Sequence, residues 1–445
     1  MRIIRTAAAV LAPLCLAAMS GCGRPAPEPP RQAPSAPTPV SVDPQVAAFY
    51  AARGHRPLWV SQGRVGPEGQ GVATMIAGAR AHGLDPERYG AAEIAAAVQA
   101  AQGGDRRALA HAEILLSRGY AAFVHDLHAS NAAKKTKYVD DGLAPEPAPP
   151  GVALESAAAP GSLDDHIVAA TRMNPLYDGL RRGFARWLAK RPPGAAGAAQ
   201  EARIRLNLDR ARAIPAHPGR YIIVDVASAR LWMVDRRKVE GPMRVIVGKS
   251  AMETPAMAGL IRFAVLNPYW NVPPDLARER AKWVLREGIG WIARERFEIL
   301  SDWGDRPRVL KPSQVDWRAV ASGKVQLRIR QLPGGANVMG RVKFMMPNDL
   351  GIYLHDFPDK SLFRRSVRNL SSGCIRLEDA PRLSRWLFGG KAPEPSSTRP
   401  EQRVDLPEPV PVYISYFTAL PDKAEGIAFQ PDVYRRDGTA QARAR

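Results

Sequence analysis

The chain has 445 residues, of which 45% are hydrophobic and 24% are charged, a balance typical of a globular protein long enough for more than one domain. Its 63 basic and 43 acidic residues give a formal net charge of +20 at pH 7, which favours acidic partners such as nucleic acid, an anionic membrane or an anionic wall polymer. The basic residues are spread along the chain without a nucleic-acid-binding motif, so we expect no nucleic-acid partner.

Residues 1–22 have the pattern of a secretory signal peptide. Two arginines precede a short apolar run over residues 6–18, well below the roughly 20 residues that a membrane span needs. The run leads into Met-Ser-Gly-Cys at residues 19–22, which resembles the lipobox of bacterial lipoproteins and implies lipid attachment at Cys22. Cleavage by the ordinary signal peptidase is the alternative. Because Gly23 is not the aspartate that retains enterobacterial lipoproteins in the inner membrane, we expect a periplasmic protein anchored in the outer membrane.

Cysteine usage indicates a reactive thiol. Of the three cysteines, Cys15 would leave with the signal peptide and Cys22 would carry lipid, which leaves Cys374 as the free thiol of the mature protein. In an oxidising compartment an unpaired thiol is a liability unless its chemistry is used. An inert buried cysteine is the general alternative, and the residues around Cys374 argue against it.

The first half of the chain is predicted to be helical. Residues 23–42 are proline-rich and predict an extended tether. Residues 43–213 place apolar side chains at three- and four-residue spacing, which is typical of helices. Two stretches inside this domain, residues 143–162 and 191–199, are rich in alanine, proline and glycine and are predicted to be loops.

The second half is predicted to be mainly β. Its β-branched runs predict strands over residues 221–226, 231–234, 243–247, 261–266, 343–346, 351–354 and 410–417. A more helical, tryptophan-bearing insertion over residues 272–326 is interpreted as a lid. The fold class is therefore predicted to be α+β, with a helical domain, a mainly β domain over residues 214–420 and a C-terminal tail over residues 421–445.

A histidine and a cysteine stand 19 positions apart in this β domain, His355 at the end of a predicted strand and Cys374 in a small polar turn. A free cysteine with a pKa of about 8.5 is only a few per cent thiolate at neutral pH, so a nearby imidazole would help to deprotonate it. The amides of Gly373 and Cys374 would stabilise an oxyanion, and Arg376 would bind a substrate carboxylate. Tyr353 shares a strand face with His355 and would reach the same cleft.

Residues 371–376, Ser-Ser-Gly-Cys-Ile-Arg, with His355 before them, resemble the signature of the L,D-transpeptidase catalytic domain, also called the YkuD domain. Ser372 stands where many members have histidine, as it does in the large periplasmic branch that carries an N-terminal scaffold domain. The resemblance covers most of residues 46–437. Further matches lie at residues 57–59, 206–210, 328–331 and 340–348.

The resemblance implies a YkuD-like β-sandwich and a monomeric enzyme that needs no cofactor and no metal. It would form 3→3 cross-links between peptidoglycan stem peptides. Cys374 would attack the third residue of a donor tetrapeptide and expel the terminal D-alanine, with His355 as base and Gly373 in the catalytic turn. The candidate substrate-binding residues are Arg376, Tyr353, Ser371 and Ser372. Carbapenems are the inhibitors that the resemblance implies.

Two other functions remain open. Water could resolve the thioester, which would make the protein an L,D-carboxypeptidase, or the domain could be a degenerate wall-binding lipoprotein, although the complete motif argues against degeneracy. Asp356 is a weak candidate for a third catalytic residue, because adjacent strand residues point to opposite faces. Residues 174–203 are too short for the wall-binding module that some members of this branch carry. Three histidines lack a recognisable set of metal ligands around them: His111, His125 and His128.

Overall fold

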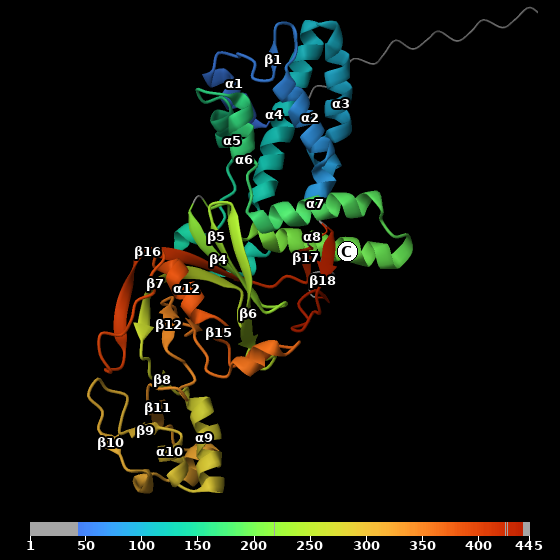
Figure 1. The fold of residues 1–445 in the computed structure, drawn as a ribbon. Coiled ribbons are helices and arrows are strands. Elements are labelled where there is room, and N and C mark those ends of the chain that lie inside the picture. Colours follow the sequence, from blue (N-terminus) through green and yellow to red (C-terminus); the bar gives the residue numbers. More distant parts are fainter. Residues whose placement is uncertain (1–42, 218, 423, 425, 439–445) are drawn as a thin grey trace, which may run out of the picture. The chain divides into compact units, whose positions relative to one another are not determined.

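The structure is a computed structural model, and it describes residues 43–217, 219–422, 424 and 426–438. Helices make up the first part of the described chain and strands dominate most of the rest (Figure 1), so the predicted α+β class is confirmed. In the described part, none of the helices combines the length and apolar content that a membrane span requires. The predicted signal peptide, Cys22 and the tether lie outside the described residues.

The helical region is organised around α4, Arg106–His128, which is its longest helix. The Asp105 carboxylate caps the start of α4 by accepting hydrogen bonds from the amides of Arg107 at 3.0 Å and Ala108 at 2.9 Å. The neighbours of α4 include α1 (Pro44–Ala52), α2 (Pro67–Ala77), α3 (Ala91–Ala100) and α5 (Pro150–Ala157). The region also contains a hairpin of β1 (Val60–Ser61) and β2 (Arg64–Val65), and the helices α6 (Leu163–Ala170), α7 (Pro175–Ala189) and α8 (Gly194–Arg212).

Two of the predicted loops contain helices, so the prediction was wrong there. Helix α5 lies inside residues 143–162, and α8 begins inside residues 191–199. Proline suits the first turn of a helix, and alanine has the highest helix propensity. The same residues that suggested loops therefore start helices at Pro150 and after Pro193.

The main sheet contains ten strands, nine of them in the order β12-β13-β15-β6-β5-β4-β16-β7-β3, with β14 paired to β6. Strand β12 also pairs with β7, so the path of hydrogen-bonded strands closes on itself. Strand β3 comes from the helical region and pairs with β7. The bounds are β3 Lys137–Tyr138, β4 Arg220–Asp225, β5 Arg230–Asp235, β6 Lys238–Gly248, β7 Met257–Leu266, β12 Val342–Met345, β13 Leu354–His355, β14 Asn369–Ser371, β15 Ile375–Leu377 and β16 Gln402–Ser415.

Alternate residues of the strands contribute to the core of this sheet, and β4 is buried on both faces. In β4, Ile222 and Val224 are fully buried in it. Helix α12, Ala380–Leu387, contributes Leu383 and Leu387 to the same cluster.

The insertion forms a small unit with its own sheet, in the order β10-β9-β11-β8. Its core includes Trp270, Trp291 and Trp317, each less than 10% exposed. The predicted lid thus contains helices, but β8 and β11 of its sheet lie beyond the predicted bounds of residues 272–326. Its elements are β8 Trp270–Asn271, α9 Pro274–Glu287, α10 Gly290–Arg294, β9 Phe297–Leu300, β10 Val309–Leu310, α11 Trp317–Ser322 and β11 Arg328–Gln331.

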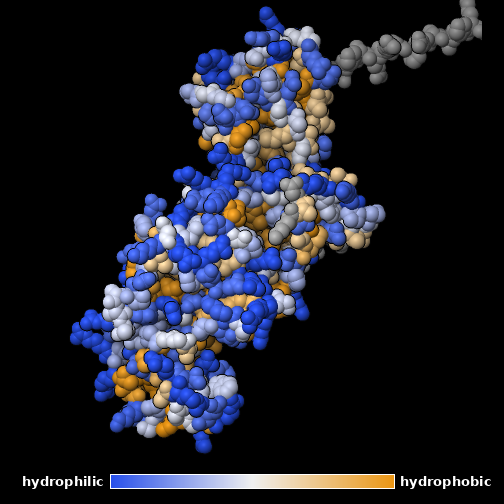
Figure 2. Space-filling view, viewed as in Figure 1, coloured by the Kyte–Doolittle hydropathy of each residue, from blue (hydrophilic) through white to orange (hydrophobic). Residues whose placement is uncertain are grey.

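The insertion also exposes apolar side chains. Hydrophilic residues cover most of the face in Figure 2, with hydrophobic patches between them, some of them over the insertion. The large hydrophobic residues exposed on the insertion are Trp283, Leu285, Ile289, Trp303, Val309 and Val325.

The described part of the predicted tail is packed against the rest of the chain. Strands β17 (Ala419–Pro421) and β18 (Ile427–Phe429) form a hairpin. Asp437 forms an ion pair with Arg210 of α8 at 2.8 Å, and Tyr434 is 7% exposed and donates a hydrogen bond to the Gly248 carbonyl. These contacts connect the C-terminal segment both to α8 and to the end of β6.

Candidate active site

Two short parallel strands, β13 and β15, bring the histidine and the cysteine to one place. Leu354 is paired with Ile375, and His355 is paired with Arg376. Leu354 and Ile375 are completely buried in the core of the main sheet. Because side chains alternate between the two faces of a strand, the opposite face carries the four side chains of interest: Tyr353, His355, Cys374 and Arg376.

His355 is buried, and a backbone oxygen holds its ring in position. The Nδ1 atom lies 2.6 Å from the carbonyl oxygen of Asp356. A carbonyl can only accept, so Nδ1 carries the proton and Nε2 keeps a lone pair. Burial and the positive charge of Arg376 lower the pKa of His355 to about 3. At neutral pH the ring is therefore uncharged and able to accept a proton.

The side chain of Asp356 has other partners. Its carboxylate accepts a hydrogen bond from the Arg341 amide at 3.0 Å and pairs with Lys360 Nζ at 2.8 Å. These two contacts engage one carboxylate oxygen each. Asp356 thus orients His355 through its main chain.

Cys374 is half-buried, and its Sγ lies 3.5 Å from the carbonyl oxygen of Gly351. Burial raises the pKa of the Cys374 thiol, against the opposing effects of the Tyr353 amide and the Arg376 charge. The net direction is upward, so the group is a thiol at neutral pH and needs a base to become a nucleophile.

Tyr353 links the cysteine to the insertion. Its ring lies 5.8 Å from the His355 ring, measured between centroids, and its hydroxyl donates to the Met339 sulfur at 3.4 Å. Met339 belongs to the core of the insertion, and Tyr353 packs against that core. Burial and the neighbouring Cys374 raise the pKa of Tyr353, so its hydroxyl remains a donor.

The turn before the nucleophile is held by internal hydrogen bonds. The Ser371 hydroxyl donates to the Cys374 carbonyl at 2.7 Å and accepts from the Gly373 amide at 3.2 Å. Ser371 is 2% exposed, so its hydroxyl belongs to the framework of the turn, and its contact with substrate stays a prediction. Ser372 is exposed. Gly373 has a φ of 116°, in the left-handed region that favours glycine.

The amides of Gly373 and Cys374 in this turn were expected to stabilise an oxyanion. The Gly373 amide is occupied by Ser371. The Cys374 amide finds no acceptor among the described residues, so it is the donor of this turn that remains open to a ligand.

Thr254, which the sequence did not single out, supports the turn from behind. Its hydroxyl donates to the Gly373 carbonyl at 2.6 Å and accepts from the Gly248 amide at 2.9 Å. Thr254 is completely buried. It lies far from the motif in sequence, and no local pattern distinguishes it.

Arg376 presents an uncompensated charge beside the cysteine. Its guanidinium carbon lies 4.3 Å from the centroid of the Phe357 ring, and its Nε is buried without a hydrogen-bond partner. In the described part of the chain no carboxylate lies within ion-pair distance of Arg376. The side chain is therefore free to receive an anion.

Two histidines of α4, His125 and His128, have structural partners. One ring nitrogen of His125 bonds to the carbonyl of Ala148 at 3.1 Å, and one of His128 bonds to that of Ala170 at 2.7 Å. Among the described residues no cluster of three or more histidine, cysteine or acidic side chains could hold a metal ion.

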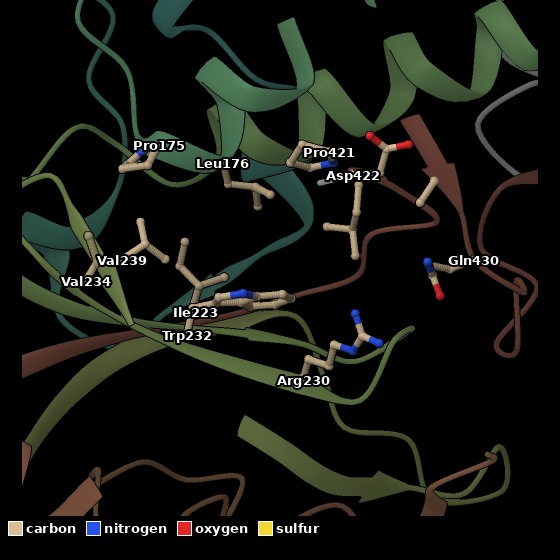
Figure 3. A pocket seen from close by; sticks show the side chains of 12 residues that line it. Pro175, Leu176, Ile223, Arg230, Trp232, Val234, Val239, Pro421, Asp422 and Gln430 are labelled. Atoms are coloured by element: carbon tan, nitrogen blue, oxygen red, sulfur yellow. The ribbon is translucent and has the colours of Figure 1, made fainter. Parts of the chain in front are cut away.

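A cavity of about 340 Å³ opens at a different place, next to β5 and the β17–β18 hairpin (Figure 3). Trp232 and Arg230 line its floor, and Leu176 and Pro421 face them. The lining is mostly apolar and includes none of the four side chains that share the face of β13 and β15.

Comparison with known proteins agrees with this geometry. The family model of the Scaffold domain matches residues 44–183, and that of the L,D-transpeptidase catalytic domain, YkuD, matches residues 219–408. A protein from Haemophilus influenzae named "Putative L,D-transpeptidase" is 28% identical over 402 residues, which cover 88% of this chain and 78% of that protein.

Two solved structures are also similar to part of the chain, at 13% identity over 44% of this chain and 58% of theirs, less than two thirds of their length. They are an L,D-transpeptidase from Mycobacterium smegmatis, with a TM-score of 0.21, and the LD transpeptidase LdtMt1 in complex with imipenem, with a TM-score of 0.20. The chain therefore carries an N-terminal Scaffold domain followed by an L,D-transpeptidase catalytic domain, YkuD.

Proposed function

We propose that this protein forms 3→3 cross-links between peptidoglycan stem peptides through a thioester on Cys374. One observation carries the proposal. A neutral imidazole, whose proton is fixed on Nδ1 by the Asp356 carbonyl, shares a strand face with a half-buried thiol and an unpaired arginine. A base, a nucleophile and a site for a carboxylate are the parts that acyl transfer from a peptide acid requires.

In the first step the thiol proton passes to Nε2 of His355 while Sγ attacks the carbonyl carbon of the third stem residue. The Cys374 amide donates to the oxyanion that forms. The tetrahedral intermediate collapses to a thioester, the carbon–nitrogen bond breaks, and the proton on His355 passes to the leaving amine of D-alanine. Hydrogen bonds between base and nucleophile often tighten only when substrate is bound, so the thiol contact with Gly351 in the free protein is compatible with this role.

In the second step the side-chain amine of an acceptor stem attacks the thioester. The amine gives its proton to His355, a peptide bond forms while the carbon–sulfur bond breaks, and the departing sulfur takes the proton back from His355. Water in place of the amine would release a tripeptide stem, the L,D-carboxypeptidase outcome. The insertion favours transfer, because its core contacts Tyr353 beside the thiol and would help to exclude water from the thioester.

The test compares two donors. Purified protein is incubated with a disaccharide tetrapeptide or with a disaccharide pentapeptide, and the products are weighed by mass spectrometry. We expect a dimer of tetrapeptide and tripeptide stems, lighter than two tetrapeptides by one alanine, and no dimer from the pentapeptide alone. Monomeric tripeptide as the sole product would support the carboxypeptidase, and binding without turnover would support a degenerate wall-binding protein. Cys374→Ala is the control for both donors.

We also propose that the protein acts in the periplasm as a monomer, anchored to the outer membrane by lipid on Cys22. The support is the lipobox-like sequence at residues 19–22 and the glycine that follows it. The wild-type protein should partition into detergent and co-fractionate with outer membranes, and Cys22→Ser should abolish both. A mature chain that begins elsewhere and carries no lipid would contradict the anchor.

A further inference from the structure

The C-terminal segment reaches the back of the catalytic turn through Tyr434. This buried tyrosine lies beyond residues 219–408, the part of the chain that matches the YkuD family model. Its hydroxyl donates a hydrogen bond to the carbonyl of Gly248, at the end of β6. The same hydroxyl accepts from the amide of Thr254, with 3.4 Å between nitrogen and oxygen. One side chain thus joins the two ends of the stretch 248–254.

The stretch 248–254 holds the catalytic turn at two points. The Lys249 amide donates to the Ser371 carbonyl at 2.9 Å, and the Thr254 hydroxyl donates to the Gly373 carbonyl at 2.6 Å. The first contact lies near the start of the stretch and the second at its end. A shift of either end would therefore move the turn.

The C-terminal segment is well anchored where it carries Tyr434. The Tyr434 ring stacks on the Tyr416 ring, with centroids 5.5 Å apart and planes inclined by 12°. The Tyr434 amide donates to the Tyr416 hydroxyl at 2.8 Å, and that hydroxyl donates to the Asp432 carboxylate at 2.7 Å. The same carboxylate accepts from the amides of Arg436 at 2.8 Å and Asp437 at 2.9 Å. Loss of the Tyr434 hydroxyl would leave all these contacts in place.

The Gly373 carbonyl that Thr254 holds belongs to the same peptide group as the Cys374 amide. A peptide group is planar, and in the trans form, which this one has, its carbonyl oxygen and its amide hydrogen point in opposite directions. Fixing the Gly373 carbonyl therefore fixes the direction of the Cys374 N–H, the donor that the proposed function assigns to the oxyanion. Loss of one oxyanion donor costs about 10²–10³-fold in kcat, so its direction matters.

We propose that Tyr434 is a positioning residue that acts through Thr254 to aim the Cys374 amide at the oxyanion of the acylation step. The C-terminal segment, which the sequence predicted to be a tail, thereby completes the active site. The inference rests on the proposed function and adds to it a residue from outside the matched domain. A residue that only stabilised the fold would affect every reaction of the thiol, whereas Tyr434 should affect only attack on a carbonyl.

The experiment compares two reactions of Cys374 in the wild type and in Tyr434→Phe. Acylation by the disaccharide tetrapeptide passes through an oxyanion, whereas alkylation by iodoacetamide displaces iodide and passes through none. Tyr434→Phe keeps the ring and should slow acylation on the order of tenfold, because it loosens the donor without removing it. Alkylation should keep the wild-type rate. Tyr138→Phe is the matched control and should alter neither rate, since its hydroxyl donates at 2.7 Å to the carbonyl of Ala213.

A double-mutant cycle tests the route through Thr254. If Tyr434 acts through the Thr254 hydroxyl, the effects of the two substitutions are not additive. The double variant Thr254→Val/Tyr434→Phe should then be acylated no more slowly than Thr254→Val alone. All rates are measured below the thermal unfolding transition of every variant.

Three results would overturn the inference: acylation of Tyr434→Phe at the wild-type rate, an equal loss of acylation and alkylation, or losses that multiply in the double variant. The second of these would indicate a structural role. Failure of the proposed function has a different signature, since the tetrapeptide would then not acylate even the wild type although Cys374 is alkylated normally.

Discussion

The Nδ1 atom of His355 lies 2.6 Å from the backbone carbonyl oxygen of Asp356, the next residue in the chain. The imidazole is thus oriented by the main chain, while the Asp356 carboxylate is engaged by the Arg341 amide and Lys360. This arrangement separates two roles that a serine-protease triad combines in one aspartate, namely orienting the ring and placing a negative charge beside it.

The first prediction follows from that separation. Asp356→Asn keeps the backbone carbonyl and should reduce kcat/KM by less than about tenfold, whereas the corresponding change in a triad costs about 10⁴-fold. Steady-state kinetics with the tetrapeptide donor measures the effect. A loss as large as that of His355→Ala would mean that the carboxylate acts directly on the ring.

The second prediction concerns pH. Because the pKa of His355 is lowered to about 3, the imidazole stays neutral throughout the range in which an ordinary histidine would be protonated. The rate of Cys374 acylation should therefore be flat between about pH 5 and pH 8, with no loss near the usual histidine pKa of about 6.5. Stopped-flow or quenched-flow acylation over that range is the measurement. An acid limb centred near 6.5 would show that His355 has an ordinary pKa and that its burial is relieved in solution.

The third prediction removes the base. His355→Ala should slow acylation at pH 7 by about 10²–10⁴-fold. The residual rate should then rise with pH, because the variant depends on spontaneous ionisation of a thiol whose pKa burial has raised. The same slope in wild type and variant would contradict a base role for His355.

The fourth prediction tests Thr254 as a positioning residue. Thr254→Val deletes the hydroxyl that bonds the Gly373 carbonyl and should lower kcat on the order of tenfold with little change in KM, while Thr254→Ser should restore it. Thr171→Val is the matched control, since it removes a hydroxyl that donates to the Ile167 carbonyl in α6. Failure of the serine variant to restore kcat would mean that the methyl group matters and the hydrogen bond does not.

The fifth prediction concerns the scaffold domain. The buried carboxylate of Glu113 accepts hydrogen bonds from the Trp59 amide at 3.0 Å, from the Leu58 amide and from the Tyr50 hydroxyl. Glu113→Ala leaves these buried donors without a partner and should reduce the free energy of unfolding by about 3 kcal/mol. Denaturant unfolding measures it, with the exposed Glu155→Ala as a control expected to stay within about 0.5 kcal/mol of the wild type. A similar small change for Glu113→Ala would show that water satisfies the donors.

The sequence predicted secondary structure where a local pattern of residues determines it. Alternation along the predicted strand that leads to His355 placed Tyr353 on the same face as His355. Strand β15 was not predicted, so the sequence did not place Cys374 and Arg376 on that face. Helical periodicity likewise identified the N-terminal region as helical, and the β-branched runs identified most strands of the main sheet.

Features of the fold and the site that depend on contacts between distant residues could not be predicted from the sequence. Thr254 reaches the catalytic turn only through the packing of the end of β6. The sheet of the insertion was missed because β8 and β10 have two residues each, too few to show an alternating pattern. Helices α5 and α8 were taken for loops because proline and alanine suit both a loop and the start of a helix.

The central claim is that Cys374 forms a thioester with the donor stem, and its most direct test is to measure the mass of that covalent intermediate. The protein is mixed with a disaccharide tetrapeptide in the absence of a competent acceptor amine, quenched in acid, and measured by intact mass and peptide mapping. The account predicts an adduct equal to the donor minus one D-alanine, located on Cys374, released by hydroxylamine and absent from Cys374→Ala. Cross-linked product formed by Cys374→Ala, or an adduct mapped to any other residue, would contradict it.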